Sequence, residues 1–130
     1  MRVAELDARV NENAFLYYPR LRSVAAYVQT HITERLTLQG AATVARLEKK
    51  YFSAFFRSKV GITWTEWLRL LRVMRAIERI EMQEDTIPRI AFGAGFRDVR
   101  TFERAFKRYL GVPPRVYRAS VRPESRPASL

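Results

Sequence analysis

The sequence contains no cysteine and a single histidine, His31. Without cysteine the chain can form neither a disulfide framework nor a cysteine-ligated zinc finger. We interpret His31 as a surface or capping residue at the end of a helix, since no second histidine could share a metal with it. The carboxylates are mostly interleaved with arginines, so no nucleophile with an adjacent base and no metal-binding cluster can be recognised. We therefore expect no enzymatic activity, no metal and no cofactor.

Long apolar runs are also missing. The first residues mix Arg2 with Glu5 and Asp7, no stretch has the length of a signal peptide, and none approaches a membrane span. The segment Gly93-Ala94-Gly95 lacks the third glycine and the preceding strand of a dinucleotide-binding loop, and turn glycines explain it better. These absences predict a soluble cytoplasmic protein that has no membrane partner.

Positive charge, by contrast, is abundant and unevenly distributed. The 24 lysines and arginines exceed the 13 aspartates and glutamates, which gives a formal net charge of +11. Residues 1–40 carry 5 basic and 4 acidic side chains, whereas residues 41–130 carry 19 and 9, a net charge of +10. A strongly basic surface predicts an anionic partner, usually nucleic acid and less often an acidic membrane or an acidic protein.

Residues 51–63 recur further along the chain as residues 101–113. The repeat keeps two phenylalanines one helical turn apart and the glycine that follows them: Phe52 and Phe102, Phe56 and Phe106, Gly61 and Gly111. The differing positions include Ser53 and Glu103, and Ala54 and Arg104. On a helix these positions point away from the phenylalanines, so one scaffold is used twice with two different outward faces.

Helical spacing of apolar residues extends along the chain and strand patterns are scarce, so we predict an all-α fold of about seven helices. We expect two helix-turn-helix subdomains joined by a long linker helix. The expected parts are an N-terminal extension at residues 1–20, a first subdomain at 21–62, the linker helix at 63–83, a second subdomain at 84–119 and a disordered tail at 120–130.

Capping residues and apolar stripes give the local detail of this prediction. Thr37 and Asp98 are expected to begin helices, and Thr63 with Glu66 has the pattern of a capping box. The predicted inward residues are Phe52, Phe55 and Phe56 in the first subdomain; Trp64, Trp67, Leu68, Leu71, Met74, Ile77 and Ile80 in the linker; and Phe102, Ala105, Phe106 and Leu110 in the second subdomain.

Several spaced motifs in the same region resemble a known family. The motifs are Ile90-Ala91, Gly95-Phe96, the run from Phe102 to Lys107, the run from Gly111 to Pro114, and Tyr117-Arg118. In this order and spacing they are similar to the C-terminal signature of the AraC/XylS transcriptional regulators. The spacing of Arg72 and Ala76 resembles that family's linker helix, and the spacing of Ala42, Phe52, Phe56 and Gly61 resembles its first helix-turn-helix. The resemblance covers about residues 21–119, and several motifs in order are more specific than any one of them.

The resemblance departs at two positions of the first unit. The family usually has glycine where this chain has Arg46, and a serine cap where it has Glu48. A residue other than glycine adopts a left-handed turn only at a cost, and Glu48 places a negative charge near the expected DNA phosphates. We therefore expect the first unit to bind more weakly than the second.

The resemblance implies that the second helix of each unit faces DNA. The residues expected to face base edges are Lys50, Ser53 and Ala54 in the first unit and Val99, Arg100, Thr101, Glu103 and Arg104 in the second. Those expected to contact phosphates are Lys49, Arg57, Lys107 and Arg108. Arg100 and Arg104 lie one turn apart, and arginine on guanine is the commonest specific contact in the major groove. Glu103 either accepts a hydrogen bond from a cytosine amino group or orients an arginine, and we favour the second role. The alternative for all the residues expected to face DNA is that they form an ordinary solvated surface.

These features predict a sequence-specific regulator that binds double-stranded DNA. The resemblance implies an activator, since most members of this family are activators. A linker of about nineteen residues, roughly 28 Å, could hold two recognition helices about one DNA turn, roughly 34 Å, apart. Because the two reading faces differ, we expect a monomer on an asymmetric site. Two alternatives stay open, namely a nonspecific nucleic-acid or nucleoid protein and a basic module that docks an acidic protein.

The N-terminal extension raises two further expectations. Only about twenty residues precede the region of resemblance, too few for a small-molecule pocket, so a stand-alone regulator controlled by its abundance or by a partner is expected. The apolar segment Phe15-Leu16-Tyr17-Tyr18 either packs on the first unit or forms an exposed patch for a partner such as RNA polymerase or a second copy of the chain.

Overall fold

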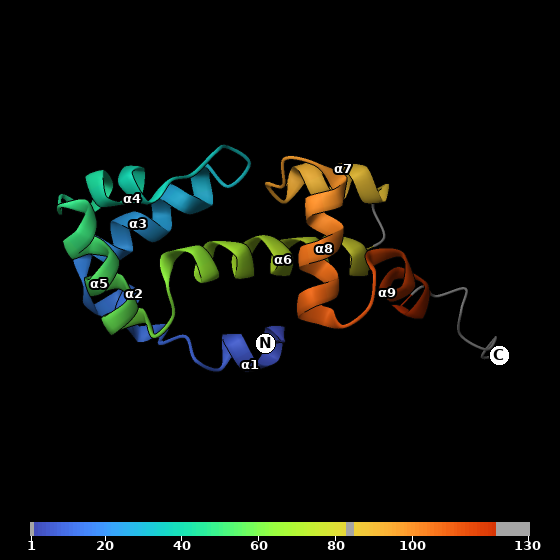
Figure 1. Cartoon of the computed structure of the whole chain (residues 1–130), viewed down its shortest axis with the longest axis horizontal. Helices are drawn as coiled ribbons and strands as arrows, with labels where there is room; N and C mark the ends of the chain where they lie inside the picture. The colour runs from blue at the N-terminus through green and yellow to red at the C-terminus, as the bar shows by residue number, and fades with distance from the viewer. Residues whose placement is uncertain (1, 83–84, 122–130) are drawn as a thin grey trace. The chain divides into compact units, whose positions relative to one another are not determined.

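The computed structural model of the chain describes residues 2–82 and 85–121. Every regular element in those ranges is a helix, which confirms the predicted all-α class (Figure 1). The helices are α1 (Val3–Asp7), α2 (Asn13–Tyr17), α3 (Pro19–Thr30), α4 (Leu38–Ala45), α5 (Lys49–Val60), α6 (Trp64–Met82), α7 (Ile87–Gly93), α8 (Val99–Leu110) and α9 (Pro114–Val121). None of the helices so described is long and apolar enough to cross a membrane.

Two details of the predicted helix layout were wrong. The described residues form nine helices instead of about seven, and one of the additional helices is α2, which the apolar segment around Phe15 forms. The disordered tail was predicted to start at Ser120, which lies inside α9. The remainder of the predicted tail, residues 122–130, and residue 83 at the predicted end of the linker lie outside the described residues.

The described residues group into two compact units, one of Ala4–Leu70 and the other of residues 2–3 with residues 71–82 and 85–121. The boundary between these groups falls inside α6, so this helix contributes residues to both cores. In each unit two short helices meet at a turn, α4 with α5 in the first and α7 with α8 in the second (Figure 1).

Aromatic rings fill the core of the first unit. Phe52 and Phe56 of α5 are fully buried, and their ring centroids lie 5.8 Å apart. The ring of Trp64 lies 6.2 Å from that of Phe52, and the ring of Trp67 lies 5.4 Å from that of Phe56. Phe55 is only half-buried, contrary to the prediction, because it is rotated by about 100° around the helix from Phe56.

The apolar segment Phe15-Leu16-Tyr17-Tyr18 was expected either to pack on the first unit or to form an exposed patch, and the structure shows part of each. Ala14 and Phe15 are buried, and the Phe15 ring stacks on Trp67 at a centroid distance of 5.0 Å. Leu16 and Tyr17, on the other hand, are 69% and 76% exposed. One face of α2 therefore completes the core of the first unit, and the other face is in solvent.

The predicted capping box opens α6. The carboxylate of Glu66 accepts a hydrogen bond from the backbone N–H of Thr63 at 3.0 Å, and the Thr63 hydroxyl accepts from the N–H of Glu66 at 3.1 Å. The apolar stripe was partly wrong: Leu71, Met74 and Ile77 are half-buried. The buried residues of α6 are Trp64, Trp67, Leu68, Leu70, Val73, Ala76 and Ile80. More than half of the residues of α6 are apolar, so the packing of neighbouring helices decides which side of α6 is buried more deeply.

The second unit repeats the phenylalanine pair of the first. Phe102 and Phe106 of α8 are fully buried with centroids 5.6 Å apart, and the ring of Phe96 lies 5.1 Å from that of Phe102. Tyr109 is buried at the end of α8, where Leu110 was predicted and is only half-buried.

Both phenylalanine-bearing helices end at a glycine in the left-handed conformation. Gly61 has a φ of 101° and donates its N–H to the carbonyl of Arg57, and Gly111 has a φ of 84° and donates to Lys107. The surroundings of the two glycines differ. A Cβ at residue 61 would lie 2.3 Å from the backbone oxygen of Arg9, whereas at residue 111 the nearest atoms belong to the guanidinium of Arg2.

We expect Gly61→Ala to destabilise the protein more than Gly111→Ala. Both substitutions place a Cβ in the left-handed region, at a cost of roughly 1 to 2 kcal/mol. Only the alanine at residue 61 would also collide with backbone, which cannot move aside as a long arginine side chain can. Urea unfolding followed by circular dichroism measures both losses, and equal losses would contradict this difference.

Candidate nucleic-acid interface

The first helix-turn-helix is closed by hydrogen bonds at each of its corners. Thr37 caps α4 by accepting from the N–H of Gly40 at 3.0 Å, as predicted. Arg46 has a φ of 58°, so it does adopt the left-handed conformation in which the family has glycine. Its N–H donates to the carbonyl of Thr43, and the N–H of Leu47 donates to the carbonyl of Ala42, the bond pattern of a Schellman turn.

Glu48 then caps α5 through its carboxylate. This carboxylate accepts from the N–H groups of Lys50 and Tyr51. Glu48 therefore caps the helix in place of the serine that is usual in the family the sequence resembles. A carboxylate at a helix N-terminus also interacts favourably with the helix dipole.

The outward face of α5 consists of the predicted residues. Lys49, Lys50, Ser53, Ala54 and Arg57 are all exposed. They are exposed because Phe52 and Phe56 occupy the opposite side of the helix and are fully buried.

The second helix-turn-helix is built with different capping residues. Thr86 caps α7 by accepting from the N–H of Arg89 at 3.4 Å, and a proline follows in the first turn. Gly95, with a φ of 100°, turns the chain, and Asp98 accepts from the N–H of Thr101 at 2.7 Å to begin α8. This turn has glycine at its left-handed position, unlike the first.

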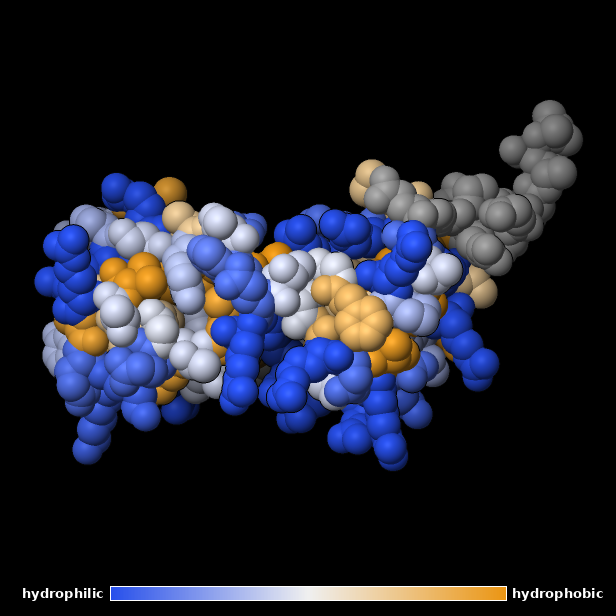
Figure 2. All heavy atoms as spheres, turned by 90° about the horizontal axis from the view of Figure 1, so that it is seen from above, coloured by the Kyte–Doolittle hydropathy of each residue, from blue (hydrophilic) through white to orange (hydrophobic). Residues whose placement is uncertain are grey.

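The outward face of α8 also agrees with the prediction. Its exposed residues are Arg100, Thr101, Glu103, Arg104, Lys107 and Arg108, and Val99 at the start of the helix is half-buried. Arg100, Arg104 and Lys107 follow one another at intervals of one turn. Hydrophilic side chains cover much of the face of the molecule that Figure 2 shows.

The basic side chains of these two outward faces form no close ion pair with another described residue. Within residues 2–82 and 85–121, no lysine or arginine of these two outward faces forms an ion pair or donates a side-chain hydrogen bond. Glu103 forms no ion pair in that part of the chain either, and both roles considered for it stay predictions. The positive charge of these faces is therefore available to an anionic ligand.

The Asp98 carboxylate is the titrating group nearest the start of α8. The hydrogen bond from the Thr101 N–H lowers the pKa of Asp98 below its ordinary value, and the charges of Arg97 and Arg104 act in the same direction. The charged form of the cap is thus favoured in the folded state.

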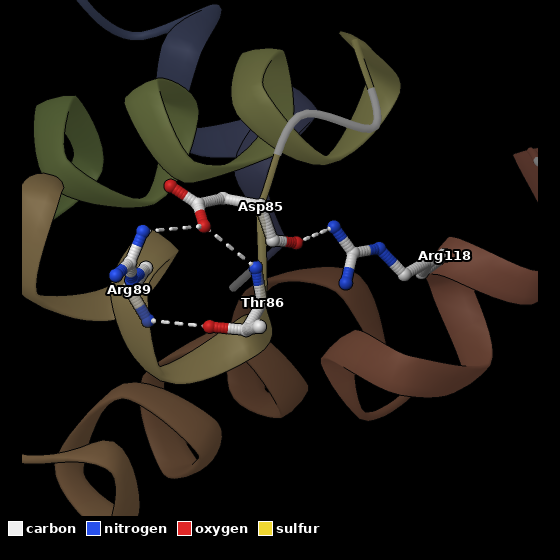
Figure 3. Close-up of polar contacts among 4 residues, drawn as sticks. All are labelled: Asp85, Thr86, Arg89 and Arg118. Atoms are coloured by element: carbon white, nitrogen blue, oxygen red, sulfur yellow. Dashed lines mark hydrogen bonds and ion pairs between the residues drawn. The ribbon is translucent and has the colours of Figure 1, made fainter.

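Contacts of the C-terminal helix were not predicted from the sequence. The hydroxyl of Tyr117 donates to the Glu81 carboxylate at 2.6 Å, and burial together with this bond raises the pKa of Tyr117 to about 12. The guanidinium of Arg118 donates to the backbone carbonyl of Asp85, and the Asp85 carboxylate accepts from the Thr86 N–H at 3.0 Å (Figure 3). The Tyr117-Arg118 motif therefore ties α9 to the end of α6 and the start of α7.

Arg20 is a second residue that the sequence analysis passed over. Its guanidinium donates to the backbone carbonyl of Ala45 at 2.7 Å and to that of Arg46 at 3.1 Å. A helix C-terminus leaves carbonyls that need partners, but no sequence pattern names a partner more than twenty residues away.

These two turns and their exposed basic helices define a helix-turn-helix protein of the kind that binds DNA. A family described as "Helix-turn-helix domain" matches residues 41–120 of the chain. Curated proteins with similar sequences, such as PocR and AarP, are described as regulators. The chain belongs to the AraC/XylS family of helix-turn-helix transcriptional regulators.

Curated relatives match at moderate identity. The regulatory protein PocR of Salmonella typhimurium is 28% identical over 111 residues, which are 85% of this chain and 37% of PocR. The HTH-type transcriptional activator AarP of Providencia stuartii is 27% identical over 100 residues, 77% of this chain and 74% of AarP. The chain spans only about two fifths of the length of several such relatives, PocR included.

Solved structures show the same fold. The DNA-binding domain of the global transcriptional factor AdpA, crystallised in complex with a target DNA, is 30% identical with a TM-score of 0.77, and the match covers 85% of this chain and 98% of that one. The C-terminal domain of AraT, a response regulator from Geobacillus stearothermophilus, is 28% identical with a TM-score of 0.76, covering 85% and 93%.

We expect the contribution of the Asp98 cap to depend on pH. Because its pKa is lowered in the folded state, the carboxylate stabilises the protein above the unfolded pKa, and this stability is lost as pH falls through the folded pKa. The urea midpoint of the wild-type protein should exceed that of Asp98→Ala at pH 7, and the difference should shrink in acid. Asp98→Asn is the control, since it keeps an oxygen acceptor but does not titrate. If the urea midpoints of the wild-type protein and of Asp98→Ala differed by the same amount at neutral pH and in strong acid, the assignment of the cap would be contradicted.

Proposed function

We propose that this protein is a sequence-specific regulator of transcription that inserts α5 and α8 into successive major grooves of double-stranded DNA. The observation that carries the proposal is the pair of capped helix-turn-helix units, each with an exposed basic helix face. The likeness to the DNA-binding domain of AdpA, a structure that includes target DNA, supports the same role for these helices. Such a regulator acts at the chromosome, which places it in the cytoplasm.

On α8, we assign base reading to Arg100 and Arg104. Both are exposed at neighbouring turns, and the two guanidinium groups could reach adjacent base pairs and bind guanine through O6 and N7. Thr101 and the half-buried Val99 lie at the start of the helix, where they could touch base edges or thymine methyl groups. The exposed Glu103 could orient one of these arginines or accept from a cytosine amino group.

On α5, Lys50 is the principal base-reading candidate, with Ser53 and Ala54 completing the face. Their side chains are shorter or more flexible than the arginines of α8, so the first unit should discriminate less between sequences. Lys49 and Arg57 here, and Lys107 and Arg108 on α8, are assigned to phosphates, which position the protein without reading sequence.

The length of α6 supports recognition of two grooves by one chain. Its 19 residues make a helix of about 28 Å, close to the roughly 34 Å that separates successive turns of DNA. Because the outward faces of α5 and α8 differ, the site of a monomer would be asymmetric. The similarity to AarP, described as an activator, favours activation, with RNA polymerase as the candidate partner.

We expect binding to weaken steeply as salt increases. The net charge of +10 on residues 41–130 implies that several phosphates are neutralised and that their counterions are released. Titration of a duplex at several salt concentrations measures the slope of log affinity against log salt. A slope near zero would exclude a phosphate-dominated interface and favour a protein partner.

We expect Arg104→Ala to weaken specific binding by roughly 1 to 3 kcal/mol and nonspecific binding much less, because a base contact is lost. Lys107→Ala removes the same charge from the same helix and should weaken binding to all duplexes alike. Affinities for a selected site and for an unrelated duplex test this difference. The same uniform loss in both variants would mean that this face of α8 does not read bases.

A further inference from the structure

The turn of the first helix-turn-helix is strained. Arg46 is the only residue other than glycine with a positive φ among the described residues. An L-residue with a side chain occupies this region only at an energetic cost, because its Cβ approaches the following carbonyl oxygen. The strained residue lies directly between α4 and the α5 N-cap, so its backbone angles set the direction in which α5 leaves the turn.

The hydrogen bonds at the end of α4 show what holds this turn. The Schellman bonds use the carbonyls of Ala42 and Thr43, which leaves the carbonyls of Ala45 and Arg46 without a backbone donor of that turn. Both accept from one nitrogen of the Arg20 guanidinium, at 2.7 and 3.1 Å. The positive charge of Arg20 also lies at the C-terminal end of α4, where the helix dipole favours a cation.

The next arginine of α3 provides a comparison. Arg22 is exposed, like Arg20, but its guanidinium donates to the carbonyl of Leu16, before α3, at 2.7 Å. The two arginines therefore have the same charge, the same helix and the same kind of acceptor, and only Arg20 reaches the turn.

We propose that Arg20 is a positioning residue for DNA recognition, which holds the left-handed turn at Arg46 and thereby fixes the orientation of α5. This inference rests on the proposed function. A helix of 12 residues is about 18 Å long, so a tilt of about 10° at its first turn moves its far end by about 3 Å and Ser53, about 6 Å along the helix, by about 1 Å. Hydrogen bonds to base edges do not tolerate such a shift, because they require donor and acceptor within about 3 Å.

The experiment compares Arg20→Ala, Arg22→Ala, Arg46→Gly and the double variant Arg20→Ala/Arg46→Gly. Each is titrated with the selected duplex, with duplexes substituted in either half of the site, and with an unrelated duplex. The half whose discrimination survives Arg104→Ala is assigned to α5. Circular dichroism and urea unfolding record the folding of each variant.

Arg20→Ala and Arg22→Ala should weaken binding to the unrelated duplex alike, since each removes one charge. Arg20→Ala should in addition lose tenfold or more of the discrimination in the half read by α5 and keep that in the half read by α8. Glycine at residue 46 adopts the left-handed conformation without strain, so Arg46→Gly should restore most of the lost discrimination in the double variant.

Two results would overturn the inference while leaving the proposed function intact. One is an Arg20→Ala variant that discriminates as well as Arg22→Ala in the α5 half. The other is a double variant that folds but has lost tenfold or more of the α5-half discrimination of Arg46→Gly; this comparison does not require a well-folded Arg20→Ala. A wild-type protein with no preference among duplexes would overturn the proposed function, and this inference with it.

Discussion

Complete burial of two phenylalanines, four residues apart, determines what each candidate recognition helix presents to solvent. Phe52 and Phe56 occupy one side of α5, and Phe102 and Phe106 occupy one side of α8. Positions rotated away from these rings must then project outward, whatever residue fills them. The outward positions can therefore vary between the two units while the packing stays the same, which is how one scaffold yields two different basic faces.

The two units reach the same shape by different local means. In the second unit the turn has a glycine with φ of 100° and an aspartate cap, so its hydrogen bonds lie within a few residues. In the first unit the turn has Arg46 in the left-handed conformation, and a guanidinium from α3 supplies the donor for its free carbonyls. The first turn therefore includes a side-chain hydrogen bond from a residue distant in sequence.

Much of the local structure could be predicted. The caps at Thr37 and Asp98 and the capping box at Thr63 are present, and the exposed residues of α5 and α8 are the expected ones. The wrongly predicted buried positions lie where two adjacent apolar residues compete for one place in the core. On α6 the deeper flank contains Val73 instead of Met74, and at the end of α8 Tyr109 is buried instead of Leu110. Hydrophobicity alone does not rank two adjacent apolar side chains.

The sequence by itself determined the helix ends and the outward faces, because caps, left-handed glycines and helical periodicity each involve residues within a turn or two of one another. Only the tertiary structure decided the contacts between distant segments. Phe15 stacks on Trp67, Tyr117 binds Glu81, and Arg20 binds the turn at Arg46. Nothing near these residues in the chain specifies their partners, since each pair meets only after the helices have packed.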